Sequence, residues 1–201
     1  MPRLFPMRPS PVAIVAGVIL AGFTVWITRQ AKGLERDLDA NSLKIALLDK
    51  PAPDFHLMAV DGRAVSLGGL RGKKLVVMFW ATWNNTSHPE MTMLNMTYER
   101  ARTPETDFNV VGIAVDDDQA AVKKFAADSR IQFPLVLDHN REMADTYGIR
   151  SIPTALIIDG DGKIIYGVVG AQRNQAEFAR QLGITPRDFR MEMGAPRGRG
   201  N

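Results

Sequence analysis

Two apolar runs constrain the fold more than any other feature of this sequence. Leu75–Trp80 (LVVMFW) is an almost unbroken hydrophobic stretch of strand length, and Phe108–Val115 (FNVVGIAV) is a second one. Strands that are buried on both faces have this character, and they occur in the centre of sheets covered by helices. The sequence therefore predicts an α/β fold with these two segments as central strands.

The segments around these strands alternate between strand and helix patterns. Further strands are expected at 54–59, 63–66, 133–137, 154–159 and 163–169. Helices are expected at 88–102, 118–128, 141–147 and 174–182. Asp61-Gly62 and Gly160-Asp161-Gly162 are turn sequences, so the first two and the last two of these further strands should each form an antiparallel hairpin.

The N-terminal segment Pro11–Ile27 (PVAIVAGVILAGFTVWI) carries no charge and has arginines on both sides. As a helix, its 17 residues would span roughly 25 Å, which is the short end of what crosses a bilayer. A cleaved signal peptide is the alternative, but residues 26–29 (WITR) offer no pair of small residues for cleavage. We therefore expect an uncleaved signal anchor, a transmembrane helix that binds the chain to a membrane.

The basic pI of 9.3 comes from the two ends of the chain. Residues 1–36 carry five basic side chains against Glu35, and residues 183–201 carry four arginines against two acidic side chains. The part between them is mildly acidic, so nucleic-acid binding is not expected. The predicted organisation is a membrane anchor at 1–29, a linker at 30–50, a globular domain at 51–185 and a disordered basic tail at 186–201.

The absence of cysteine restricts the chemistry. None of the 201 residues is cysteine, which excludes disulfides, zinc–thiolate sites, iron–sulfur clusters and thiol nucleophiles. His56, His88 and His139 are far apart in sequence, and Asp116-Asp117-Asp118 has no further oxygen ligands at fixed spacing. We interpret the three aspartates as a solvated helix start and expect neither a metal nor a cofactor.

Three motifs in order carry a family resemblance. They are PAPDFHL at 51–57, DGRAVSLGGLRGKKLVVMFWATW at 61–83 and YGIRSIPTALIIDGDGKI at 147–164. Together they closely resemble the TlpA/ResA-like redoxins, of AhpC/TSA type, in the thioredoxin superfamily, over residues 50–185. The resemblance implies a thioredoxin-like fold with a central mixed sheet flanked by helices, and a cis-proline at Pro153.

In that family the FWATW motif runs into a Cys-x-x-Cys sequence at the start of the first long helix. Here Asn84 stands at the position of the nucleophilic cysteine and Ser87 at that of the resolving cysteine. Disulfide exchange needs a thiolate, which neither side chain can provide. The resemblance therefore implies a pseudoenzyme that has lost thiol–disulfide oxidoreductase activity.

Family members are typically tethered by an N-terminal helix in an extracytoplasmic space. The resemblance thus implies a single-pass protein of the bacterial inner (cytoplasmic) membrane with its domain on the periplasmic side. The positive-inside rule does not decide the orientation, because basic residues lie on both sides of Pro11–Ile27.

The residues around positions 84 and 87 match the family more closely than these two positions do. Glu90 matches its acidic residue one turn into the helix, and Pro153 matches the cis-proline beside which a peptide pairs in redox-active relatives. Thr92 stands where many members have a kinking proline. We expect the chain to bind a protein or an extended peptide in this degenerate active-site groove. The predicted binding residues are Trp83, Asn84, Asn85, Thr86, Ser87, Glu90, Ile152, Pro153 and Thr154.

Other interpretations stay open at this point. Asn84 and Ser87 are both good helix-capping residues, and this can be their whole role. Trp83 can cover the edge of the core instead of touching a partner. The chain could also be a redoxin-family oxidoreductase, thiol–disulfide or peroxide related, that acts by a non-thiol or partner-supplied route, or a structural subunit whose groove is vestigial.

Overall fold

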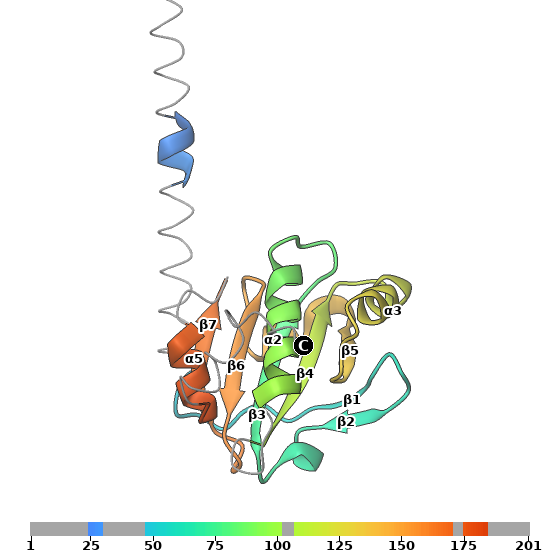
Figure 1. Cartoon of the computed structure of the whole chain (residues 1–201), viewed down its shortest axis with the longest axis vertical. Helices are drawn as coiled ribbons and strands as arrows, with labels where there is room; N and C mark the ends of the chain where they lie inside the picture. The colour runs from blue at the N-terminus through green and yellow to red at the C-terminus, as the bar shows by residue number, and fades with distance from the viewer. Residues whose placement is uncertain (1–23, 30–46, 102–106, 171–174, 185–201) are drawn as a thin grey trace, which may run out of the picture. The chain divides into compact units, whose positions relative to one another are not determined.

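The computed structural model describes residues 24–29, 47–101, 107–170 and 175–184 (Figure 1). The chain divides into two compact units, residues 1–38 and 39–201, which are described separately. In the first unit residues 24–29 are helical; the rest of the predicted anchor lies outside the described residues. No helix in the described part of the chain is both long enough and apolar enough to cross a bilayer. Most of the predicted linker and the whole predicted tail also lie outside that part.

The second unit is built on a five-stranded mixed sheet in the order β5-β4-β3-β6-β7 (Figure 1). The strands are β3 (Lys74–Trp80), β4 (Phe108–Val115), β5 (Leu135–Asp138), β6 (Thr154–Ile158) and β7 (Ile164–Val169). β3, β4 and β5 run parallel, and β6 and β7 each run antiparallel to the strand before them in the sheet. The two apolar runs lie at adjacent central positions, and the last two strands form a hairpin, as predicted.

Helices cover both faces of this sheet. They are α2 (Ser87–Ala101), α3 (Gln119–Asp128), α4 (Glu142–Thr146) and α5 (Gln175–Leu182), with 3-10 turns η1 (Gly68–Leu70) and η2 (His139–Arg141). Each α-helix lies where the sequence predicts one, with ends that differ by a residue or so. Along β3, Val76, Met78 and Trp80 pack on the α2, α3 and α5 side, while the alternate residues face the other core. This alternation is the two-residue period of a strand.

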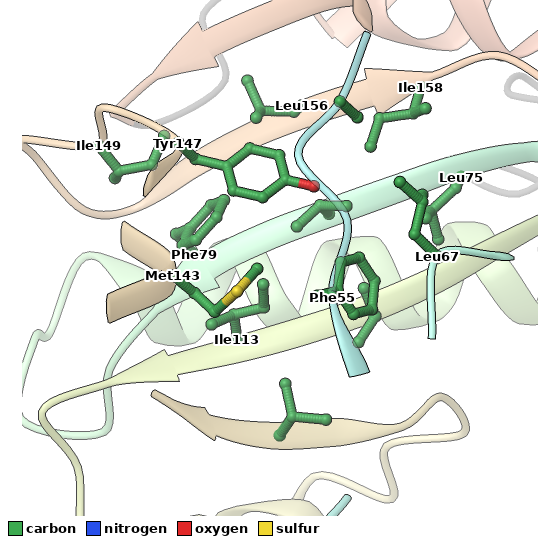
Figure 2. Close-up of a cluster of buried hydrophobic side chains, with 14 of the residues drawn as sticks. Phe55, Leu67, Leu75, Phe79, Ile113, Met143, Tyr147, Ile149, Leu156 and Ile158 are labelled. Atoms are coloured by element: carbon green, nitrogen blue, oxygen red, sulfur yellow. The ribbon is translucent and has the colours of Figure 1, made fainter. Parts of the chain in front are cut away.

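The other core contains α4 and the segment that leads into the sheet (Figure 2). Here the Tyr147 ring lies 5.5 Å from the Phe79 ring, between centroids, and its hydroxyl donates to the Pro53 carbonyl at 2.6 Å. The Tyr147 side chain is fully buried. Burial, with the nearby Asp54 charge, raises the pKa of the Tyr147 phenol well above its usual range.

A hairpin of β1 (His56–Met58) and β2 (Ala64–Ser66) completes the domain, as the Asp61-Gly62 turn predicts. The chain after β1 continues along β5, where Val60 N–H donates to the Leu135 carbonyl at 2.8 Å. The hairpin therefore covers the β5 edge of the central sheet (Figure 1).

Candidate functional site

Three loops meet at the carboxyl ends of β3 and β4, the end of an open α/β sheet where ligands commonly bind. The β3–α2 loop is residues 81–86, the β4–α3 loop is residues 116–118, and the cis-proline loop is residues 148–153. Phe79 pairs with Thr154 across β3 and β6, which places the cis-proline loop beside the end of β3. The Ile152–Pro153 peptide bond is cis, as the family resemblance implied.

The side chain of Asn84 joins two of these loops. Its Oδ1 accepts hydrogen bonds from the N–H and the hydroxyl of Thr86, at 2.9 and 2.6 Å. Its Nδ2 donates to the carbonyl oxygen of Ile152 at 3.0 Å. The bonds to Thr86 close a turn before α2, which begins at Ser87, so they do not test the capping interpretation of Asn84. The bond to Ile152 was not predicted.

Ser87 is buried completely, and this corrects part of the predicted binding site. Its Oγ accepts a hydrogen bond from the Ala81 N–H at 3.4 Å, so it contacts the preceding loop and not a partner. Glu90, Pro153 and Thr154 are also buried. The side chains of these four residues therefore offer little or no surface to a ligand.

Five of the predicted residues reach the surface. Trp83, Asn85 and Thr86 are exposed, and Asn84 and Ile152 are half-buried. The Trp83 side chain is 59% exposed, and its Nε1 donates to the carbonyl of Asp116 at 3.2 Å. An indole this exposed covers little of the core. Its hydrogen bond to the Asp116 carbonyl, in the β4–α3 loop, orients the ring.

Asp117 is a site residue that its sequence pattern did not indicate. We predicted that all three aspartates would be solvated, but the Asp117 side chain is nearly buried, at 8% exposure. Its carboxylate accepts from the N–H and the hydroxyl of Thr82, at 2.5 and 2.6 Å, and from the Asp118 N–H at 2.9 Å. Asp118 lies at the predicted helix start and caps α3 by accepting from the Ala121 N–H at 3.0 Å. The aspartate next to the cap thus ties the β3–α2 loop to the β4–α3 loop.

His88 has a structural position beneath the loop. Its Nε2 lies 2.7 Å from the Thr82 carbonyl oxygen, and its ring packs against Phe125 with centroids 5.0 Å apart. In the described part of the domain, His88 makes no hydrogen bond with Ser87, so the pair does not form a nucleophile and base. The same residues include no cluster of side chains able to hold a metal ion.

A small cavity lies between α2 and α5, with room for about one water molecule. Its lining residues are Glu90, Met93, Leu94, Thr97, Gln175, Phe178 and Ala179. Neither Trp83 nor Ile152 lines it, so the surface formed by the three loops is separate from this cavity.

Known proteins share both the sequence pattern and the fold. A family model described as the AhpC/TSA family matches residues 48–167. Thiol-disulfide oxidoreductase ResA of Bacillus thuringiensis (strain Al Hakam) is 30% identical over 139 residues, which cover 69% of this chain and 79% of that protein.

Two solved structures illustrate the similarity in fold. The thiol:disulfide interchange protein of Chlorobium tepidum TLS, a thioredoxin family protein, superposes with a TM-score of 0.60 at 29% identity, over 67% of this chain and 94% of that one. The exposed lipoprotein thioredoxin of Streptococcus pneumoniae strain TIGR4 gives a TM-score of 0.56 at 26% identity, over 65% of this chain and 98% of that one.

Proposed function

This chain belongs to the AhpC/TSA family and has a thioredoxin-like fold, and from that membership we propose that it binds a protein or extended peptide without thiol chemistry. The ligand lies on the surface formed by Trp83, the β3–α2 loop and the cis-proline loop. The alternative, an oxidoreductase that works by a non-thiol or partner-supplied route, has no observation in its favour.

The chemistry of the site supports the loss of activity. The relative from Bacillus thuringiensis is named a thiol-disulfide oxidoreductase, and that reaction passes through a mixed disulfide with the enzyme's thiolate. Here an amide and an alcohol, Asn84 and Ser87, stand at the start of α2, and no other cysteine is available in the sequence. The chain itself therefore has no atom that can form the covalent intermediate.

The observation that carries the binding proposal is that the exposed Trp83 precedes Asn84, whose side chain bonds Ile152 of the cis-proline loop. Trp83 presents an exposed, oriented indole, and tryptophan is enriched among residues that dominate binding energy. Ile152 is half-buried, and within the described residues its N–H makes no hydrogen bond. An unpaired backbone donor beside an aromatic surface suits an extended segment that supplies a carbonyl and an apolar side chain.

The proposal includes a membrane anchor at 1–29, a linker at 30–50, the redoxin domain at 51–185 and a basic tail at 186–201. Its support is the uncharged Pro11–Ile27 segment between arginines. One similar protein is described as an exposed lipoprotein, which supports placing the domain outside the cytoplasm, at the periplasmic side of a bacterial inner membrane.

Site-specific photo-crosslinking in the native membrane tests the proposal. Asn85 is the suitable probe position, since it is exposed beside Trp83 and Asn84, whereas Ser87 is buried. Lys163 is the control, because it is exposed in the turn between β6 and β7, at the opposite end of β6 from the site. A discrete adduct at Asn85 with none at Lys163 is expected. Failure to obtain an adduct at Asn85 would argue for a vestigial site.

A further inference from the structure

The hydrogen bond from Asn84 to Ile152 changes which backbone groups a ligand can use. An extended peptide that pairs fully with one residue accepts from its N–H and donates to its carbonyl. The Ile152 carbonyl already accepts the Asn84 Nδ2–H at 3.0 Å, and the Ile152 N–H has no acceptor in the described part of the domain. Ile152 therefore offers its N–H to a ligand, while its carbonyl oxygen already accepts a hydrogen bond from Asn84.

The orientation of the Asn84 amide follows from its neighbours. Oδ1 lies against the N–H and hydroxyl of Thr86, at 2.9 and 2.6 Å, and a backbone N–H can only donate. Reversing the amide would bring two donors together at Thr86 and two acceptors together at Ile152. The arrangement is self-consistent in one orientation only, with the nitrogen directed at the Ile152 carbonyl.

The Ile152 carbonyl has a second lone pair, but the Asn84 amide already lies against this oxygen between the β3–α2 loop and the cis-proline loop, where the proposed function places the ligand. A peptide N–H facing Ile152 would leave water without gaining a good acceptor, which weakens binding. Proline has no N–H and avoids this cost.

The exposed indole favours the same ligand. The Trp83 N–H is already used by the Asp116 carbonyl, so the indole offers its apolar faces. Aromatic surfaces of this kind bind proline-containing extended segments, which are rigid before binding. We propose that Asn84 makes this site selective for an extended segment in which a proline faces Ile152. This inference rests on the proposed function and names its ligand class.

Nuclear magnetic resonance titration of the full chain in detergent micelles tests the inference. The probes are two capped nine-residue alanine–serine peptides that differ only in a central proline or alanine. The Ile152 N–H and Trp83 Nε1–H resonances report binding. The proline peptide should bind roughly three- to tenfold more tightly, the equivalent of one hydrogen bond.

Three variants test whether the preference for proline depends on the Asn84 side chain or on a general change in the loop. Asn84→Ala frees the Ile152 carbonyl and should bring the ratio of the two affinities close to one. Asn84→Asp still accepts from Thr86 but cannot donate to Ile152, so a ligand N–H would face acceptors there and the preference for proline should again be lost. Thr86→Ala is the matched control, because it removes one bond to Asn84 and leaves the bond to Ile152, so the preference for proline should persist.

The outcomes distinguish the two proposals. Equal binding of both peptides to the wild-type chain, or a preference that survives Asn84→Ala and Asn84→Asp, would overturn the inference and leave the proposed function standing. If neither peptide shifts either resonance in any variant, the inference is overturned, and the proposed function is then decided by the crosslinking at Asn85.

Discussion

Thr82 directs both its backbone N–H and its hydroxyl at the carboxylate of Asp117, at 2.5 and 2.6 Å. The two residues belong to different loops, 35 positions apart in the sequence. Because Asp117 is nearly buried, these bonds form where water competes weakly for either partner. They fix the start of the β3–α2 loop, and with it the position of Trp83.

Replacing this carboxylate should destabilise the domain. In Asp117→Asn one carboxylate oxygen becomes an amide nitrogen, which faces a Thr82 donor and leaves it unsatisfied. We expect a loss of about 1–3 kcal/mol in the free energy of unfolding, measured with urea. Asp118→Asn is the matched control, since asparagine caps helices as well as aspartate does. Equal losses in the two variants would contradict the role given to Asp117.

Trp83 should matter for binding much more than for stability. Trp83→Ala removes an exposed indole, so the yield of the Asn85 adduct should fall at least about tenfold, as for a central interface residue. The free energy of unfolding should change by less than about 1 kcal/mol, because only one exposed hydrogen bond is lost. Met96→Ala, at another exposed apolar side chain, should leave the adduct unchanged. An adduct insensitive to Trp83→Ala would place the partner elsewhere.

Restoring the two cysteines should restore thiol chemistry. Ser87 is the first residue of α2, and a helix N-terminus stabilises a thiolate there or at the preceding half-buried position 84. We expect Asn84→Cys combined with Ser87→Cys to catalyse insulin reduction by dithiothreitol, whereas the wild-type chain gives only the buffer rate. Ser87→Cys alone is the control and should not turn over. An inactive double variant that folds normally would show that the site has diverged beyond its two cysteines.

Tyr147 should make the domain sensitive to alkaline pH. Burial raises the pKa of its phenol in the folded state, so the unfolded state loses the proton first as pH rises. Stability should therefore be retained below about pH 10, the ordinary pKa of tyrosine, and decline above it. Tyr147→Phe should flatten this decline while costing about 0.5–1.5 kcal/mol at neutral pH through the lost bond to Pro53.

Urea unfolding at pH 7 to 11 measures both effects. Tyr166→Phe is the comparison, since burial also raises the pKa of Tyr166 and its removal should flatten the decline less. If the free energy of unfolding of Tyr147→Phe fell as steeply with alkaline pH as that of the wild type, Tyr147 would not be the group responsible for the decline.

The fold could be predicted from the sequence because each helix or strand is specified by residues close to it in the chain. The apolar run of β3 has the length and composition of a buried strand, and an aspartate at position 118 is a typical residue for the start of a helix. Turn residues between β6 and β7 fix their pairing in the same way. Such patterns lie within a few residues of the element that they specify.

The contacts of the site could not be predicted in this way. Asn84 and Ile152 are 68 positions apart, and only the order of strands in the sheet brings them together. The burial of Ser87 was also unpredictable, because a serine at a helix start is usually a solvated cap. For Asp117 the residue type was misleading: a run of aspartates favours solvent, and only the position of Thr82 on the neighbouring loop explains its burial.

The hydrogen bonds that join the three loops affect how fast a ligand can bind. Thr82 with Asp117, and Asn84 with Ile152, hold the surface together before any ligand arrives. A surface that is already ordered needs no slow rearrangement on encounter, so association should proceed at the rate of ordinary docking. Ligands of this site should therefore differ in the lifetimes of their complexes and hardly at all in their association rates.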